Sequence, residues 1–301
     1  MSDLPRLKYR LLAFAAARLA GPVERVGVEQ ARRDLRRGGP GFVMGWRPTL
    51  ESIRDAAVAG VRVRRYVPAG AAAGTVVFFH GGGWVLGDLQ SHDVLAARLA
   101  TATRRIVVSV DYRLAPEDTY PAAIEDALTV FDALEGPVVV AGDSAGGNLA
   151  AVVANERRGG VAAQLLAYPV VDCGTEHPSY AAFAEGHFLT RETMRFFTRT
   201  YVPDAARRVE PRCSPLRTPS LVGAPPAYVL LAGCDPLRDE GRAYAERLGK
   251  AGVDLMVDEV PGTIHGFFSM QGLREGRGAL ERMARWLELR WPAATPSTRS
   301  A

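Results

Sequence analysis

Cysteine is scarce in this sequence, and its scarcity limits how the chain can be held together. The 301 residues include three cysteines, Cys173, Cys213 and Cys234, and no two of them have the C-x-x-C spacing of metal or redox sites. So small and odd a number argues against a disulfide scaffold and favours a reducing compartment. We therefore expect a cytoplasmic protein.

Metal-ligand and phosphate-binding patterns are missing as well. The five histidines are isolated along the chain, and neither H-E-x-x-H nor H-x-x-E-H occurs. The P-loop pattern G-x-x-x-x-G-K is also absent. The sequence therefore predicts neither a bound metal ion nor another cofactor.

The N-terminal region lacks an apolar run long enough for a membrane span. Its longest run, residues 11–17, has seven residues, whereas a membrane-spanning helix needs about 20. Arg6, Lys8 and Arg10 precede the run as they would in a secretory signal, but Arg18 follows it directly and the cleavage pattern is poor. We expect an ordinary amphipathic helix here and no membrane span.

Lysine is nearly absent, because all but two of the 37 basic residues are arginines. The net charge is +4, and the arginines are scattered apart from a denser stretch between Arg32 and Arg65. Nucleic-acid binding would need a basic face with interleaved aromatic residues or a known module, and the sequence shows neither. We interpret the arginines as a solvated surface and expect no nucleic-acid partner.

Apolar residues make up 48% of the chain, which is enough for a full core. After about residue 60, short β-branched runs alternate with helical periodicity, which predicts an α/β fold with a mostly parallel sheet covered on both faces. The expected strands are 53–58, 61–67, 75–80, 106–111, 138–142, 164–168, 227–233 and 253–260. The expected helices between and after them are 93–102, 122–134, 145–157, 239–251 and 279–290.

Two segments fall outside this alternation. They are residues 1–50 and an insertion at 176–221, which contains a helical stretch at 191–201. We expect the two segments to form one helical cap over a catalytic domain at 51–291. Residues 292–301 are expected to form a flexible tail.

A serine motif is the first candidate for chemistry. Gly142-Asp143-Ser144-Ala145-Gly146 matches G-x-S-x-G, with a strand pattern before it and a helical pattern after it. In that context a tight turn strains the serine backbone, and the glycines let neighbouring backbone approach. The sequence therefore predicts Ser144 as a nucleophile.

A glycine-rich motif, H-G-G-G-W at 80–84, ends the third expected strand. Successive glycines expose backbone N–H groups, which acyl transfer needs where negative charge develops on a carbonyl oxygen. We predict that Gly82, Gly83 and the N–H of Ala145 form an oxyanion hole. Gly81 is expected to shape the turn.

Apolar residues near these motifs are candidates for an acyl pocket. Trp84 follows the glycine loop, and Leu11, Leu12 and Phe14 belong to the expected first helix. Ordinary packing explains each of them equally well.

A nucleophilic serine needs a base and an acid. On a sheet of this kind they follow the serine in the order acid, histidine, and only His265 lies late enough in the chain. Asp235, two residues after an expected strand, is best placed to orient the imidazole, and Asp239 is the alternative. Other charged residues near strand ends are interpreted as structural hydrogen-bonding groups: Asp111, Glu117 and Asp143.

Taken together, these motifs resemble those of the bacterial hormone-sensitive-lipase-like (family IV) carboxylesterases of the α/β-hydrolase superfamily. The resemblance covers about residues 50–291. It implies an eight-stranded, mostly parallel sheet with a helical cap, a triad of Ser144, Asp235 and His265, and an oxyanion hole from the glycine loop and Ala145. The matching segments are H-G-G-G at 80–83, D-Y-R-L-A-P-E at 111–117, G-D-S-A-G-G-N at 142–148, D-P-L-R-D-E at 235–240 and H-G-F at 265–267.

The resemblance also implies a function, hydrolysis of small esters with short to medium acyl chains. A thioesterase, an amide deacetylase or an acyltransferase would use the same triad and stays an alternative. A non-catalytic receptor is a further alternative, but the receptor family with this fold lacks the catalytic histidine, and His265 argues against it. A homodimer through the last expected strand or the final helix, as in some relatives, is left open.

Overall fold

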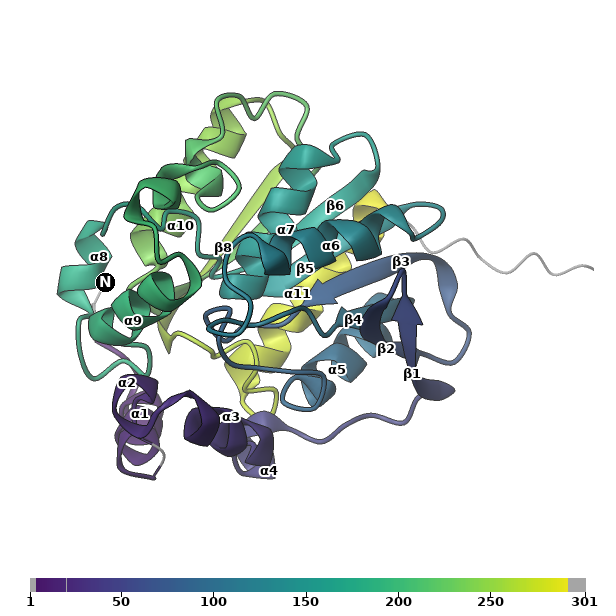
Figure 1. Ribbon diagram of the computed structural model, residues 1–301. Coiled ribbons are helices and arrows are strands. Elements are labelled where there is room, and N and C mark those ends of the chain that lie inside the picture. The colour runs from purple at the N-terminus through teal and green to yellow at the C-terminus, as the bar shows by residue number, and fades with distance from the viewer. Residues whose placement is uncertain (1–3, 20, 292–301) are drawn as a thin grey trace, which may run out of the picture.

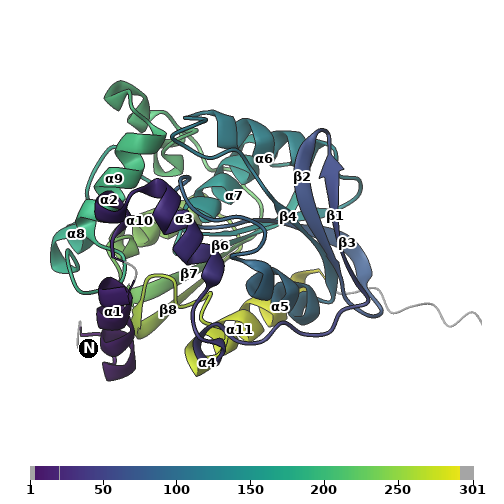
Figure 2. The ribbon, with the colours of Figure 1, turned by 60° about the horizontal axis from the view of Figure 1, so that its bottom comes forward.

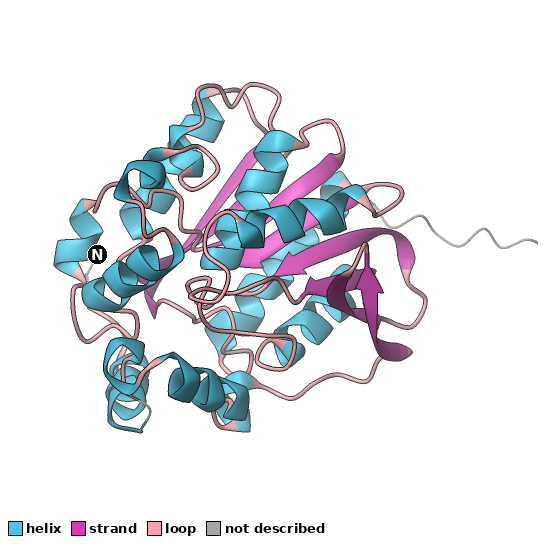
Figure 3. Ribbon diagram, viewed as in Figure 1, coloured by secondary structure: helices cyan, strands magenta, loops and turns pink. Residues whose placement is uncertain are grey.

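The computed structural model describes residues 4–19 and 21–291, and an eight-stranded sheet forms its centre (Figures 1 and 3). The strand order is β1-β2-β4-β3-β5-β6-β7-β8. The pairs β1–β2 and β2–β4 are antiparallel and all other neighbouring pairs are parallel, which confirms the predicted sheet. The strands are β1 (Ser52–Val58), β2 (Val61–Val67), β3 (Ala72–Phe79), β4 (Arg105–Val110), β5 (Val138–Asp143), β6 (Val161–Ala167), β7 (Ala227–Cys234) and β8 (Leu255–Ile264).

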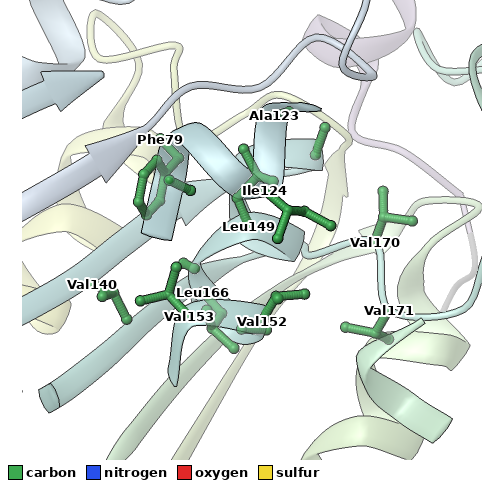
Figure 4. Packing of buried hydrophobic residues seen from close by; sticks show 14 of the residues in the cluster. Phe79, Ala123, Ile124, Val140, Leu149, Val152, Val153, Leu166, Val170 and Val171 are labelled. Carbon is green, nitrogen blue, oxygen red and sulfur yellow. The ribbon is translucent and has the colours of Figure 1, made fainter. Parts of the chain in front are cut away.

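Five longer helices cover the two faces of the sheet: α5 (Asp93–Thr103), α6 (Ala122–Asp132), α7 (Ala145–Glu156), α10 (Arg238–Lys250) and α11 (Arg274–Arg290). Alternate side chains of a strand point to opposite faces, so the core has two layers. Phe79 of β3 packs in one layer with Ile124 of α6 and Leu149 of α7 (Figure 4). The preceding residue, Phe78, belongs to the other layer with Leu280 of α11.

The start of α11 was predicted wrongly by about one turn. The helix begins at Arg274, whereas the apolar periodicity first appears at residue 279. Gly276 and Gly278 interrupt the helical pattern in the sequence. Gly276 serves close packing instead, since a Cβ there would lie 2.5 Å from the carbonyl oxygen of Met270.

The segments before β1 and between β6 and β7 add further helices. In both views α1, α2, α8 and α9 gather on the same side of the molecule (Figures 1 and 2). Thr193 of α9 donates to Glu24 of α2 at 3.1 Å, so the two segments are in contact. Their action as one cap over a separate catalytic domain stays a prediction, and the expected tail 292–301 lies outside the described residues. The helices are α1 (Leu7–Leu19), α2 (Val23–Val26), α3 (Val28–Arg37), α4 (Gly41–Met44), α8 (Pro178–Ala182) and α9 (Arg191–Tyr201), with 3-10 turns η1 (Ala205–Val209) and η2 (Pro215–Arg217).

Over residues 4–19 and 21–291, each helix is too short or too polar to cross a bilayer.

Candidate active site

Ser144 lies at the sharp turn between β5 and α7. Its φ of 56° and ψ of −118° form a conformation that non-glycine residues rarely adopt. A Cβ at Gly142 would lie 2.2 Å from the carbonyl oxygen of Gly146, and a Cβ at Gly146 would lie 1.9 Å from that of Phe79. Because these obstacles are backbone atoms, both positions require glycine. The surrounding structure thereby holds Ser144 in a strained, fixed orientation, as the motif predicted.

The carboxyl ends of β5, β7 and β8 bring three polar side chains together. His265 Nε2 lies 2.9 Å from Ser144 Oγ, and His265 Nδ1 lies 2.7 Å from Asp235 Oδ2. Asp235 has no exposed surface, while Ser144 and His265 are each 7% exposed. The contacts therefore run from a fully buried carboxylate, through the imidazole, to the hydroxyl of a serine that keeps only a small exposed surface. Such an arrangement can move a proton from the hydroxyl to the imidazole while the carboxylate holds the other ring nitrogen.

The acid of this arrangement is Asp235 and not the alternative, Asp239. Asp235 Oδ1 accepts the N–H of Leu237 at 2.9 Å, which fixes the carboxylate. Asp239 lies in the first turn of α10 and bonds instead to Arg238 at 2.9 Å and Arg242 at 3.3 Å. Of the two candidates, only Asp235 reaches the imidazole.

The glycine loop after β3 adjoins the turn at Ser144. Gly82 and Gly83 have φ values of 123° and 63°, and a Cβ at Gly83 would lie 2.2 Å from the ring of Phe197. Within the described part of the chain, the N–H groups of Gly82 and Gly83 have no acceptor. Ala145 is the first residue of α7, so its N–H has no partner in the helix. These three groups are available to bind an anionic oxygen.

Trp84 connects the glycine loop to α9. Its ring stacks on that of Tyr201 in α9, with centroids 4.5 Å apart and planes 10° apart, and it has no exposed surface. Packing therefore accounts for Trp84 in this arrangement. Its contact with substrate stays a prediction.

Asp143 holds the glycine loop against the nucleophile turn. Its Oδ1 accepts the N–H of Gly81 at 2.9 Å and lies 3.7 Å from His92 Nε2. Burial by itself would raise the pKa of this carboxyl. The charge of His92 and its hydrogen bond, with smaller contributions from the charges of His80 and His265, instead hold the pKa below its usual value. Burial, followed by the charge of His92, lowers the pKa of His80 to about 4. A carboxylate between two histidines thus supports the loop, which agrees with the structural role expected for Asp143.

Arg32 of α3 is a residue whose place the sequence did not reveal. Its Nε donates to the carbonyl oxygen of Val85 at 2.9 Å, and its Nη2 donates to that of Ala115 at 3.0 Å. Both Nη atoms bond to the carboxylate of Glu117 at 2.8 Å. The side chain is 15% exposed, so the interpretation of this arginine as solvated surface was wrong. Nothing in local periodicity separates it from its neighbour Arg33.

Tyr168 was missed for a similar reason. Its ring centroid lies 4.5 Å from that of His265, and burial raises its pKa well above the ordinary value. The only signal for Tyr168 in the sequence is its position between β6 and Pro169. Contacts with a histidine almost 100 positions later in the chain leave no local pattern.

The described residues contain no group of three or more histidine, cysteine, aspartate or glutamate side chains arranged to hold a metal ion. The absence of a metal or other cofactor stays a prediction.

The fold and the site together have the design of a serine hydrolase of the α/β type, with the serine on a strand-turn-helix elbow and the acid and histidine after it. A family model described as "alpha/beta hydrolase fold" matches residues 76–269, and the chain belongs to this family. The resemblance to hormone-sensitive-lipase-like esterases is confirmed.

The curated relatives are ester hydrolases. The chain is 40% identical to the carboxylic ester hydrolase LipN of Mycobacterium tuberculosis over 240 residues, which cover 73% of this chain and 64% of LipN. It is 34% identical to the ethyl acetate hydrolase of Pseudomonas putida over 305 residues, which cover 91% of this chain and 95% of that enzyme. The first match thus spans slightly less than two thirds of its relative, and the second spans nearly all.

Solved structures of esterases have the same fold. An ester hydrolase from the metagenome of Lake Arreo, complexed with a derivative of bipyridine phosphonate, superposes with a TM-score of 0.87 at 38% identity, covering 95% of this chain and 99% of that one. A hyperthermophilic esterase from Pyrobaculum calidifontis gives 0.87 at 34% identity, covering 95% and 98%.

Proposed function

We propose that this protein is a serine carboxylesterase that hydrolyses small esters with short to medium acyl chains. The observation that carries the proposal is the unbroken chain of contacts from Asp235 through His265 to Ser144, at 2.7 and 2.9 Å. The names of the relatives, carboxylic ester hydrolase and ethyl acetate hydrolase, support the same bond type and a short acyl group.

In the proposed mechanism, Ser144 Oγ attacks the ester carbonyl carbon while His265 Nε2 takes its proton. Asp235 orients the imidazole and stabilises the imidazolium that forms. The tetrahedral intermediate collapses when the carbon–oxygen bond to the alcohol breaks and His265 returns the proton to the leaving oxygen. Water then attacks the acyl-enzyme with His265 again as base, which releases the acid and regenerates Ser144.

The negative charge of both tetrahedral intermediates falls on the former carbonyl oxygen. We assign the N–H groups of Gly82, Gly83 and Ala145 to bind it. Two of them come from a loop that Asp143 supports and the third from the first residue of α7, so their directions are set before substrate arrives.

The direct test is hydrolysis of p-nitrophenyl esters from acetate to palmitate by the wild type and Ser144→Ala. We expect turnover of the shorter esters that falls at least about 10³-fold in the variant. Activity restricted to thioesters, to amides or to transfer onto an alcohol would assign the triad to those reactions instead. Binding of an ester without turnover by the folded wild type would indicate a receptor.

A cytoplasmic location and a homodimer complete the proposal. In the described residues no disulfide joins Cys173, Cys213 or Cys234, as in a reducing compartment. β8 is an edge strand, and its Met256 and Val257 are each 43% exposed, which suits pairing with a second copy. A disulfide in protein isolated from its natural source would contradict the first assignment, and a monomer in sedimentation velocity would contradict the second.

A further inference from the structure

The N-terminal helix α1 exposes a stripe of large apolar side chains. Leu7, Leu11 and Phe14, spaced as one helix face, are 68%, 60% and 61% exposed, and Leu4 just before the helix is 67% exposed. Leu11 and Phe14 therefore form neither a pocket wall nor part of the core, which were the two alternatives from the sequence. Contiguous exposed apolar surface of this kind marks an interaction site.

This stripe is not the face that holds α1 on the protein. Tyr9 and Ala13, on the opposite side of the helix, are buried. The Tyr9 hydroxyl and the Lys8 ammonium bond to Glu275 of α11, and Arg6 forms an ion pair with the same carboxylate. The helix is thus fixed by one face, and the stripe Leu4–Leu7–Leu11–Phe14 is free for another contact.

Cations outnumber carboxylates around the stripe. Residues 4–19 contain four cations, Arg6, Lys8, Arg10 and Arg18, and no aspartate or glutamate. Glu275 pairs with Arg6 and Lys8, which leaves Arg10 and Arg18 for other anions. The Arg18 guanidinium lies 5.0 Å from the centre of the Phe14 ring, at the end of the stripe. An apolar stripe bordered by cations is the pattern of a helix that lies in the interface of an anionic membrane.

The neighbouring N-terminal helices carry more of the same surface. In Figure 1, α1, α3 and α4 lie along the lower edge of the molecule. Phe42 of α4 is 72% exposed and Trp46, just after it, is 76% exposed. Exposed aromatic side chains suit the headgroup region of a bilayer.

We propose that α1 docks this protein on an anionic lipid surface, with the stripe Leu4–Leu7–Leu11–Phe14 in the acyl boundary and Arg10 and Arg18 on the headgroups. A second copy of the chain is disfavoured as the occupant, because it would bring like charges together around the stripe. An anionic lipid neutralises them.

The docking surface is tied to the active site. The N–H of Arg6 donates to the carbonyl oxygen of Gly262 at 3.0 Å, and Gly262 lies in β8 three residues before His265. The residue directly before the lipid-contacting helix is therefore bonded to the strand that ends directly before the catalytic histidine. On the proposed function as an esterase, the favoured substrates are apolar esters that partition into the lipid surface.

Flotation of the full-length protein with phosphatidylcholine vesicles, with and without phosphatidylglycerol, tests the proposal. We expect binding that needs the anionic lipid and weakens with salt. Leu4→Ser combined with Leu7→Ser should lower the partition coefficient at least about tenfold. The matched control, Val222→Ser combined with Leu289→Ser, changes side chains that are 67% and 72% exposed elsewhere and should bind as the wild type.

Equal binding by the stripe and control variants, or no binding to either vesicle, would overturn the proposal. A dimer in sedimentation velocity that the stripe variant alone dissociates would assign the surface to a second copy. Because flotation needs no turnover, Ser144→Ala should float as the wild type does, and loss of esterase activity alone leaves lipid docking intact. Hydrolysis of water-soluble p-nitrophenyl acetate should be the same in the stripe variant and the wild type.

Discussion

At the scale of single residues, the least expected feature of the site is the carboxylate of Asp143. It is adjacent to Ser144 in the chain, yet it bonds to Gly81, more than 60 residues earlier. A Cβ at Gly81 would lie 2.5 Å from Asp143 Oδ2, so this position accepts only glycine. This hydrogen bond joins the turn at Ser144 to the loop that carries the proposed oxyanion hole.

Asp143→Ala should therefore weaken the stabilisation of the transition state more than it weakens substrate binding. We expect kcat to fall roughly tenfold to 100-fold, with KM changed little, because the Gly81 N–H loses its acceptor and the loop N–H groups lose their alignment. Asp143→Asn, which keeps an oxygen acceptor, should recover part of kcat. Steady-state kinetics on p-nitrophenyl acetate measure both constants.

The control for this comparison is Asp132→Ala, which removes a surface ion pair with Arg157. It should leave kcat unchanged. A rise in KM with constant kcat for Asp143→Ala would show that the residue acts on binding and not on the loop geometry.

The sequence predicted the residues that form the triad but not those that support it. Ser144, Asp235 and His265 each lie in a short motif beside a strand end, and chain order selects among the candidates. The partners of Arg32 and Tyr168 are distant in the chain and meet them only through the folded backbone. Positions of this kind leave no periodic or motif signal.

At the scale of elements, Arg32 links α3 to the loops that follow β3 and β4. It donates to two carbonyl oxygens and to Glu117, so one side chain ties the N-terminal segment to the region of the glycine loop. Arg32→Ala should lower the free energy of unfolding by roughly 1 to 3 kcal/mol, since buried carbonyl groups lose a charged donor. Urea denaturation measures the change.

The adjacent residue provides the matched control. Arg33 on the same helix bonds to Gln30 one turn away and is 54% exposed. Arg33→Ala should change stability by less than about 0.5 kcal/mol. Equal losses in the two variants would mean that α3 responds to lost helix propensity and not to the contacts of Arg32.

Regular elements were predictable where side-chain burial decides them. All eight strands were anticipated, because their apolar runs are short, β-branched and bounded by turn residues. The start of α11 was not anticipated, because a glycine such as Gly276 usually disfavours a helix. In the structure Gly276 lies inside the helix and allows close approach to the backbone of Met270. The contact of α2 with α9 joins the two segments that were expected to form the cap, but α2 itself was not anticipated as a helix, because an element of four residues leaves no apolar periodicity.

At the scale of the whole molecule, one buried carboxyl links stability to pH. Glu240 of α10 has no exposed surface and accepts the N–H of Val171 at 2.7 Å, where the chain leaves β6 for the cap insertion. Burial raises its pKa to about 8. The folded state therefore binds this proton more tightly than the unfolded state does, and its stability declines as pH rises from the ordinary glutamate range towards 8.

Glu240→Gln should remove this dependence, because glutamine keeps an acceptor and has no charge to bury. We expect the melting temperature of the variant, measured by calorimetry, to rise relative to that of the wild type as the pH increases from 5 to 8. Glu246→Gln, on the exposed side of the same helix, is the control and should follow the wild type. A constant difference between wild type and Glu240→Gln across this range would contradict the assignment.

The proposed esterase function requires Ser144 to be an activated nucleophile. Reaction with diethyl p-nitrophenyl phosphate, followed by intact-mass spectrometry and peptide mapping, tests this most directly. We expect one diethylphosphoryl group per chain on Ser144, no label in Ser144→Ala, and labelling slowed at least about 10²-fold in His265→Ala. A folded wild type that stays unlabelled, or that carries the label on another residue, would contradict the central claim.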